Sequence, residues 1–515
     1  MENRKVRVRF APSPTGPLHI GGVRTALYNY LFAHKHGGDF ILRIEDTDQK
    51  RFVPGAEEYI IESLKWCGIT PNEGVGFGDG PHGPYRQSDR KPIYRQYADQ
   101  LINDGHAYYA FDTPEELDDM KARLTAAGVS SPQYNAITRQ SMKNSLTLSE
   151  DEVKQKLSDG EQYVIRMKVP RNEEIRVHDI IRGWVVVNSA QMDDKVLFKS
   201  DGMPTYHLAN IVDDYLMKIT HVIRGEEWLP SAPLHVLLYR CLGWESVMPQ
   251  FAHLPLLLKP DGNGKLSKRD GDRLGFPVFP LQWQDPSSNE ISSGYREKGY
   301  FPEAVVNFLA FLGWNPGNNQ EIFSLNELVE SFSLERVSKS GAKFDFEKAK
   351  WYNQQYLRKT DDAILAEKFM PILSEKGIKA DKEYVTNVCK LIKEKAHFVN
   401  EFWSLGSYFF VAPEDYDADV IKKRWNDAAA KFIFELQKSF SELEVFDSIN
   451  VERVFKETAE NLQIGSGAVM QLFRVCISGL GGGPVLFDVV ATIGKQEIVN
   501  RLKTALEKLP KLVQA

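Results

Sequence analysis

The stretch at residues 11–22 constrains the fold more than any other part of the chain: it reads Ala-Pro-Ser-Pro-Thr-Gly-Pro-Leu-His-Ile-Gly-Gly. Ahead of it, Val6, Val8 and Phe10 alternate with polar residues, a pattern that predicts a strand. Behind it, apolar residues recur at helical spacing until two glycines at 37–38, which predicts a helix. A strand, a proline-rich loop and a helix in this order are typical of the start of an α/β domain.

Three residues of this stretch, His19, Gly21 and Gly22, fall at the predicted entrance of the helix. The first turn of a helix has backbone N–H groups without intrahelical partners, and its dipole favours an anion. Glycines also let a ligand approach the backbone closely. We therefore expect free N–H groups here to bind phosphate. Because the chain has neither a dinucleotide fingerprint nor a Gly-x-x-x-x-Gly-Lys-Ser/Thr loop, nucleotide binding must use another device.

Length and composition predict a soluble protein of several domains. A chain of 515 residues is too long for one ordinary core, and 42% hydrophobic and 26% charged residues are typical of globular proteins. No apolar run is long enough to cross a bilayer, and the N-terminus lacks the apolar core of a signal peptide. We expect a cytoplasmic protein without membrane contact.

The four cysteines, Cys67, Cys241, Cys389 and Cys476, lie far apart and form no Cys-x-x-Cys pair. This spacing argues against a disulfide framework and against a zinc site built from cysteines. The formal net charge of −6 does not indicate nucleic-acid binding, although an RNA-binding face can be local.

The order of patterns along the chain predicts an α/β domain that is interrupted and then followed by helices. Strand and helix patterns alternate over 1–106, where the apolar run 40–46 is typical of a buried parallel strand. Mixed helical and strand patterns over 107–195 predict an α+β insert, and the α/β pattern resumes over 196–258. A basic loop opens residues 259–342, and only helices are predicted over 343–515.

Local signals predict individual elements. Thr113, with Glu116 three residues later, is a candidate capping box, and Ser231 is a candidate cap for a helix over 232–242. Residues 381–403 fit one helix. Residues 273–293 have no clear periodicity and several prolines, so we expect a surface insertion there.

A second chemical candidate is the glycine-rich basic loop at 259–271, in which Lys265 and Lys268 flank Ser267. Their ammonium groups could supply point charges to the phosphates to which His19 could donate a hydrogen bond. Alone, a histidine beside glycines is more often structural, and a lysine-rich loop is usually only solvated. Together, at the two ends of one α/β domain, the histidine and the lysine-rich loop are a specific signal of a nucleotide site.

This combination resembles the two signatures of the class I aminoacyl-tRNA synthetases, Pro-Leu-His-Ile-Gly-Gly at 17–22 and Lys-Leu-Ser-Lys-Arg at 265–269. Further stretches narrow the resemblance to the bacterial-type glutamyl-tRNA synthetases: these are residues 9–16, 43–48, 83–88, 204–214, 222–228 and 311–316. It covers essentially the whole chain. It implies a Rossmann-like α/β catalytic domain (1–106 and 196–258) with an acceptor-binding α+β insert (107–195). A stem-contact region (259–342) and an all-α anticodon-binding half (343–515) follow.

The resemblance implies a glutamate pocket built from Arg9, Ala11, Ser13, Glu45, Tyr206, Asn210 and Arg224. A substrate with two carboxylates and an ammonium group needs both kinds of charge, and arginine grips carboxylates bidentately. Arg224 is then the better candidate for the side-chain carboxylate, and Glu45 for the α-ammonium group. Without the resemblance, an ion pair of Arg224 with Asp213 or Glu226 would be the favoured interpretation.

For ATP, the resemblance implies His19 and Gly21 at the phosphates, Glu227 and Trp228 near the nucleoside, and Lys265 and Lys268 over the phosphates. The implied reaction joins L-glutamate to the 3′ end of its tRNA through a glutamyl-adenylate and releases pyrophosphate and AMP. Mg²⁺ is expected with ATP. Some relatives hold zinc through cysteines of the insert; residues 100–180 contain no cysteine, so no zinc is predicted.

Several alternatives stay open. The chain departs from the class signatures by having Gly22 in place of a second histidine and Leu266 in place of methionine. A non-discriminating form would also charge the glutamine tRNA with glutamate. A glutaminyl enzyme would have an all-β anticodon domain, a truncated tRNA-modifying relative would end near residue 310, and a small-molecule nucleotidyltransferase would not need the helical half. A non-catalytic tRNA-binding paralogue would not need the intact His19 and Lys268. We expect a monomer.

Overall fold

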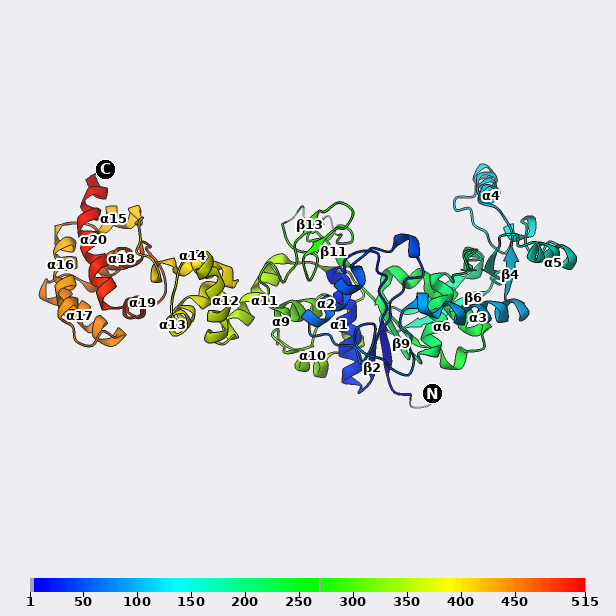
Figure 1. Cartoon of the computed structure of the whole chain (residues 1–515), viewed down its shortest axis with the longest axis horizontal. Helices are drawn as coiled ribbons and strands as arrows, with labels where there is room; N and C mark the ends of the chain where they lie inside the picture. The colour runs from blue at the N-terminus through cyan, green and yellow to red at the C-terminus, as the bar shows by residue number, and fades with distance from the viewer. Residues whose placement is uncertain (1–3, 268–269, 272, 274, 515) are drawn as a thin grey trace. The chain divides into compact units, whose positions relative to one another are not determined.

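The computed structural model describes residues 4–267, 270–271, 273 and 275–514. The chain forms two compact units, the first made of Met1–Lys298 and Pro302–Lys348 and the second of Gly299–Phe301 and Ala349–Ala515 (Figure 1). Within the described ranges, no helix combines the length and apolar character that crossing a bilayer requires.

The first strands of the chain form a three-stranded sheet, which lies beside a second, four-stranded sheet; the two together are called the central sheet below. Strands β1 (Arg7–Phe10), β2 (Asp39–Leu42) and β3 (Glu73–Gly74) pair in parallel in that order, with Val8 opposite Phe40. All four residues of β1 are buried. The predicted strand before residue 11 is confirmed, as is the predicted buried parallel strand within 40–46.

The second half of the sheet lies on the other side of β1. Strand β9 (His221–Gly225) pairs in parallel with β10 (Gln250–Leu254), which pairs in parallel with β6 (Glu174–Asp179). Strand β7 (Gly183–Asn188) closes this edge antiparallel to β6. The N–H of Thr220 donates to the carbonyl of Arg7 at 2.9 Å, so β9 begins beside β1. The strand order therefore reverses at β1, and such a switch point opens a crevice at the carboxyl ends of the strands.

The insert has a separate antiparallel sheet made of β4 (Ala107–Ala110), β5 (Val164–Met167) and β8 (Val196–Phe198). The strands do not follow the predicted limits of the insert, 107–195. Strand β8 begins after residue 195 but joins the sheet of the insert, whereas β6 and β7 lie before it and join the central sheet. Strand patterns alone do not specify which sheet a strand enters, since partners are chosen by tertiary packing. The limits between the parts stay predictions.

Two helix starts of the first unit were predicted from cap signals. The capping box predicted at Thr113 and Glu116 is confirmed, with both reciprocal hydrogen bonds present. The cap predicted at Ser231 is wrong: Ser231 has helical dihedral angles and caps nothing, because a 3₁₀ turn over Glu226–Ser231 leads directly into the next helix. The helices of this unit are α1 (Ile20–Lys35), α2 (Ala56–Trp66), α3 (Lys91–Asn103), α4 (Pro114–Ala126), α5 (Glu150–Ser158), α6 (Tyr206–Leu216), α7 (Ala232–Cys241), α9 (Pro302–Ala310) and α10 (Leu325–Ser331).

The segment 273–293 is only in part the surface insertion that we expected, because residues 276–281 are buried whereas most of 284–291 is exposed. It holds a short hairpin, β12 (Trp283–Gln284) with β13 (Ile291–Ser292), and the carbonyl of Val278 accepts a hydrogen bond from the N–H of Ile20 at 3.0 Å. The buried part was missed because its backbone is irregular. Its apolar side chains therefore do not recur at helix or strand spacing in the sequence. These side chains are Phe276, Val278, Phe279, Leu281 and Trp283. Strands β11 (Leu257–Leu258) and β14 (Ala342–Lys343) pair nearby in parallel.

The second unit is helical, and from residue 349 to 514 no strand is assigned. The single helix predicted over 381–403 is wrong, because it ends at Ile392. Arg358 donates to the carbonyl of Glu394 at 3.1 Å and Asn353 to that of His397 at 2.7 Å, so tertiary donors take carbonyls that a continuous helix would use. The helices are α11 (Phe346–Lys359), which spans the limit of the two units, α12 (Asp362–Glu375), α13 (Lys382–Ile392), α14 (Phe402–Gly406), α15 (Ala418–Arg424), α16 (Asp427–Glu442), α17 (Ser448–Asn461), α18 (Ser466–Ser478), α19 (Leu486–Ile493) and α20 (Lys495–Gln514).

Candidate active site

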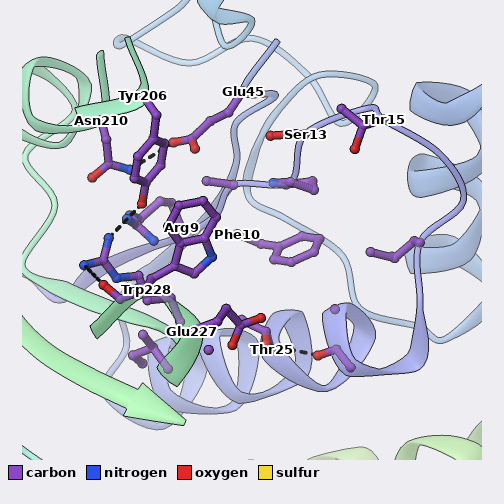
Figure 2. A pocket seen from close by; sticks show the side chains of 18 of the residues that line it. Arg9, Phe10, Ser13, Thr15, Thr25, Glu45, Tyr206, Asn210, Glu227 and Trp228 are labelled. Carbon is purple, nitrogen blue, oxygen red and sulfur yellow. Dashed lines mark hydrogen bonds between the residues drawn. The ribbon is translucent and has the colours of Figure 1, made fainter. Parts of the chain in front are cut away.

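A cavity of about 400 Å³ opens where β1 and β9 end, at the switch point of the central sheet (Figure 2). The loop after β1, the entrance of α1, the start of α6 and the turn after β9 line it. Ten residues predicted from the sequence lie in its wall: Arg9, Ala11, Ser13, Gly21, Glu45, Tyr206, Asn210, Arg224, Glu227 and Trp228. The structure thus brings most of the predicted glutamate and ATP residues together.

On the β1 side, the arginine in the wall is already neutralised. Arg9 holds both oxygens of the buried carboxylate of Asp214, at 3.0 and 3.2 Å. Arg43, which is fully buried, donates to the same carboxylate at 2.7 Å and to Glu45 at 2.8 Å. Burial would raise the pKa of Asp214, but Arg9 and Arg43 lower it below its ordinary value. The side chains of Arg9, Arg43, Asp214 and Glu45 form a network of two cations and two anions.

Glu45 enters the cavity from the loop after β2, and only part of its carboxylate is engaged. Its Oε1 accepts from Arg43 at 2.8 Å and from the amide of Asn210 at 3.0 Å (Figure 2). Neither bond uses Oε2. A carboxylate held in this way by one oxygen can offer the other to a cationic ligand group.

On the β9 side, Arg224 is 5% exposed, and no aspartate or glutamate of the described residues forms an ion pair with it. Its guanidinium contacts only uncharged partners: Tyr206 Oη at 2.8 Å, His253 Nε2 at 3.0 Å, the carbonyl of Trp228 at 3.3 Å and His235 Nδ1 at 3.5 Å. Burial lowers the pKa of Arg224, because the charged form is poorly solvated. A carboxylate ligand in the cavity would supply the missing counter-charge.

The local ion pairs considered for Arg224 are absent. Asp213 is bound instead by Arg90 at 2.7 Å, and Glu226 by Arg182. Arg90 and Arg182 are both far from these acids in the sequence, so closeness along the chain did not predict the ion-pair partners.

The expectation of free amides at the entrance of α1 is wrong. Nδ1 of His19 accepts from the N–H of Gly21 at 3.1 Å, the N–H of Gly22 donates to the carbonyl of His19 at 2.8 Å, and that of Ile20 donates to Val278. His19 therefore caps its own helix. Because Nδ1 is an acceptor, the neutral ring carries its proton on Nε2. The dipole of α1 and the side chain of His19 can still favour phosphate, but the backbone N–H groups of Ile20, Gly21 and Gly22 already donate to protein acceptors.

Of the predicted ATP residues, Gly21, Glu227 and Trp228 line the cavity, and Lys265 contacts Glu227. The ammonium group of Lys265 lies 3.1 Å from Glu227, and both side chains are about half exposed. The indole of Trp228 packs on the ring of Tyr206, with centroids 4.5 Å apart (Figure 2). His19 and Lys265 do not line the cavity itself. Lys268 lies outside the described residues.

Further side chains of the site that the sequence did not single out are Arg43 and Asp214, behind the wall, and Thr15, Thr25 and Arg51 in it. Asp214 carried one usable signal: with Asp213 it forms an acidic pair directly after the mostly apolar stretch 208–212 of a predicted helix. The four cysteines are unpaired. Among the residues that the structure describes, no group of three or more histidine, cysteine, aspartate and glutamate side chains is arranged to hold a metal ion.

Comparison with known protein families accounts for both units. Residues 5–351 match "tRNA synthetases class I (E and Q), catalytic domain", and residues 364–506 match "Anticodon binding domain". These matches confirm the resemblance stated from the motifs, and they support the predicted order of an α/β catalytic part and an all-helical C-terminal part.

Individual relatives match over their whole length. The glutamate–tRNA ligase of Cytophaga hutchinsonii is 58% identical over 514 residues, which are 100% of this chain and 99% of the relative. That of Phocaeicola vulgatus is 59% identical, over 99% of this chain and 100% of the relative. A crystal structure of a glutamate tRNA ligase from Elizabethkingia meningosepticum in complex with its amino acid has a TM-score of 0.94 and 51% identity, covering 98% of this chain and 100% of that one. This chain belongs to the class I tRNA synthetases (E and Q) and, among them, to the glutamate–tRNA ligase family.

Proposed function

We propose that this protein ligates L-glutamate to the 3′ end of the glutamate tRNA, using ATP and releasing AMP and pyrophosphate. The observation that carries the proposal is Arg224, a buried cation without a counter-anion among the described residues, in the wall of a cavity at the switch point. A dicarboxylate substrate supplies that counter-charge. The full-length similarity to proteins named as glutamate–tRNA ligases supports the same substrate.

In this proposal the glutamate side-chain carboxylate binds Arg224 and the hydroxyl of Tyr206, which lie 2.8 Å apart. The α-ammonium group binds the free oxygen of Glu45, held in place by Asn210. Arg9 keeps the wall in shape through Asp214, and Ala11 and Ser13 leave room beside it for the backbone of the substrate. The two ends of the substrate thereby meet opposite charges, which selects an amino acid with a second carboxylate.

The first chemical step is attack of the α-carboxylate oxygen of glutamate on the α-phosphorus of ATP. A mixed anhydride forms, and the bond to pyrophosphate breaks. Charge accumulates on the phosphoryl oxygens, so positioned cations contribute most of the catalysis. Lys265 and Lys268 are the proposed cations, and His19 donates a hydrogen bond from Nε2 to a phosphate oxygen. Gly21 lies close to the phosphates, and Glu227 and Trp228 hold the nucleoside. Mg²⁺ enters as part of the substrate, on the phosphate oxygens.

In the second step a ribose hydroxyl of the terminal nucleotide attacks the carbonyl carbon of the adenylate, and AMP leaves. The insert 107–195 would hold the acceptor end, 259–342 the stem and 343–515 the anticodon. The protein would act as a monomer in the cytoplasm. No observation favours charging of the glutamine tRNA, the alternative left open by the sequence.

Charging assays with purified protein test the proposal. We expect labelled glutamate to be attached to the glutamate tRNA in the presence of ATP and Mg²⁺, with stoichiometric release of AMP and pyrophosphate. The glutamine tRNA and labelled glutamine are the matched controls. Failure to charge the glutamate tRNA, or equal charging of the glutamine tRNA, would contradict the specificity proposed.

A further inference from the structure

We propose that Asp179 and His253 form a positioning pair that orients Arg224 for the glutamate side chain without neutralising its charge. The inference rests on the proposed function, because it assigns the carboxylate ligand to Arg224. Neither residue lines the cavity. Both side chains are fully buried behind the sheet edge at which β6 and β10 end.

Asp179 is saturated by donors. Its Oδ1 accepts from the backbone N–H groups of Ile181 at 3.0 Å and Arg182 at 2.8 Å. Its Oδ2 accepts from the backbone N–H of His253 at 3.0 Å and lies 2.6 Å from Nδ1 of the same residue. The carboxylate is therefore fixed in place and can only accept from the imidazole.

This arrangement determines the tautomer of His253. Because Asp179 accepts, Nδ1 carries the proton, and the neutral ring presents a bare Nε2. That nitrogen accepts from Nε of Arg224 at 3.0 Å. The chain of bonds runs from a fixed carboxylate through an oriented imidazole to the guanidinium, as a second layer of side chains orients the ligands of other charged sites.

An uncharged acceptor is what such a site requires. A carboxylate in place of the imidazole would orient Arg224 equally well but would neutralise it, as Asp214 does Arg9. With Nε held by His253 and one terminal nitrogen by Tyr206, the plane of the guanidinium is fixed while its charge stays available. A ligand that meets a pre-oriented partner loses less conformational entropy on binding.

The surroundings of His253 keep it neutral. The charged and titratable groups that face it are Asp179, Arg182 and Arg224, with His235 on α7 behind. Burial lowers the pKa of His253, with Asp179 opposing the effect. A proton on Nε2 would replace an acceptor by a donor facing Arg224, so only the neutral ring can serve this role.

Substituting Asp179→Asn tests the tautomer directly. The amide oxygen would keep the two backbone N–H groups at the Oδ1 position, so the amide nitrogen would lie at the Oδ2 position. There it could donate to Nδ1 of His253, but it could no longer accept from the backbone N–H of His253. The ring would then carry its proton on Nε2 and turn a donor toward Arg224. We expect the KM for glutamate to rise about tenfold to a hundredfold, as for loss of one hydrogen bond to a charged group. The KM for ATP should stay within about twofold.

A pair of substitutions at His253 separates positioning from packing. His253→Gln retains an acceptor that can reach Arg224, whereas His253→Leu has none. We expect His253→Leu to raise the KM for glutamate about as much as Asp179→Asn, and His253→Gln to restore at least half of that loss on a logarithmic scale. His221→Gln, a histidine replaced on β9 away from Arg224, is the matched control and should leave both KM values unchanged.

A double-mutant cycle distinguishes failure of this inference from failure of the proposed function. If Arg224→Met does not raise the KM for glutamate, the site itself is wrong and the inference falls with it. If Arg224→Met raises it but His253→Leu does not, only the positioning pair is wrong. Equal increases in the KM for ATP and for glutamate would also overturn the pair. Support requires that His253→Leu adds nothing in the Arg224→Met background.

Discussion

The two sides of the cavity treat a buried arginine in opposite ways. On the β1 side, Arg9 is matched by Asp214, which also holds Arg43. On the β9 side, Arg224 has only uncharged acceptors among the described residues. Both guanidinium groups are about equally buried, at 3% and 5% exposure, so solvent does not explain the difference.

This contrast separates a structural cation from a ligand-binding one. A buried charge is tolerated when a partner compensates its desolvation, and an uncompensated charge beside a cavity indicates that the partner comes from outside. The sequence placed both Arg9 and Arg224 in the glutamate pocket and favoured Arg224 for the side-chain carboxylate, but it did not show how either charge is compensated. The following predictions test that they are not equivalent.

The largest effect is expected on the β1 side. Asp214→Asn leaves Arg9 and Arg43 buried with one negative charge fewer, and we expect it to lower the free energy of unfolding by about 3–5 kcal/mol. Chemical denaturation of the ligand-free protein measures this change. Asp118→Asn, at an exposed ion pair, is the control and should change stability by less than about 0.5 kcal/mol. Equal stabilities of the two variants would contradict the structural role of Asp214.

The second prediction sets the two arginines against each other. Arg224→Met should raise the KM for glutamate about a hundredfold, with that for ATP within about threefold, and should hardly change stability because no ion pair is broken. Arg9→Met should mainly lower stability, because it disrupts the network around Asp214. Aminoacylation kinetics and thermal unfolding of both variants provide the comparison. The contrast fails if the two substitutions give the same pattern.

The smallest effect concerns pH. Burial, with Lys195 and Arg224 adding to it, lowers the pKa of His207 on the β9 side to about 4. The unfolded chain takes up this proton below about pH 6.5, where the folded protein does not, so stability is present above pH 6.5 and is lost as the pH falls toward 4. We expect this to cost roughly 1–3 kcal/mol. The pKa of Asp214 is lowered instead, so its contribution is lost only at more acidic pH, below about 3.8.

Unfolding in urea at pH 7 and at pH 4.5 measures the effect, and His207→Gln should reduce the difference between the two pH values. An unchanged difference in that variant would assign the loss to other groups. His221, whose pKa burial also lowers to about 4, should behave in the same way but independently.

Local patterns predicted much of the fold correctly because their causes are local. The strand before residue 11, the buried strand within 40–46 and the capping box at Thr113 depend on alternation, apolar runs and short-range hydrogen bonds. The prediction of one helix over 381–403 was wrong, and that of a surface insertion at 273–293 was only partly right, for a shared reason. Distant residues there take over backbone groups or cover side chains, which no window of sequence contains.

The sequence by itself determined the family and the strand–loop–helix start, and through the family resemblance it named ten of the residues that line the cavity. Only the tertiary structure decided how charge is distributed among them. Asp214 lies more than two hundred residues from Arg9 along the chain, and His253 reaches Arg224 from a neighbouring strand. Whether a buried arginine is compensated depends on such contacts through space, and so does its availability to a ligand.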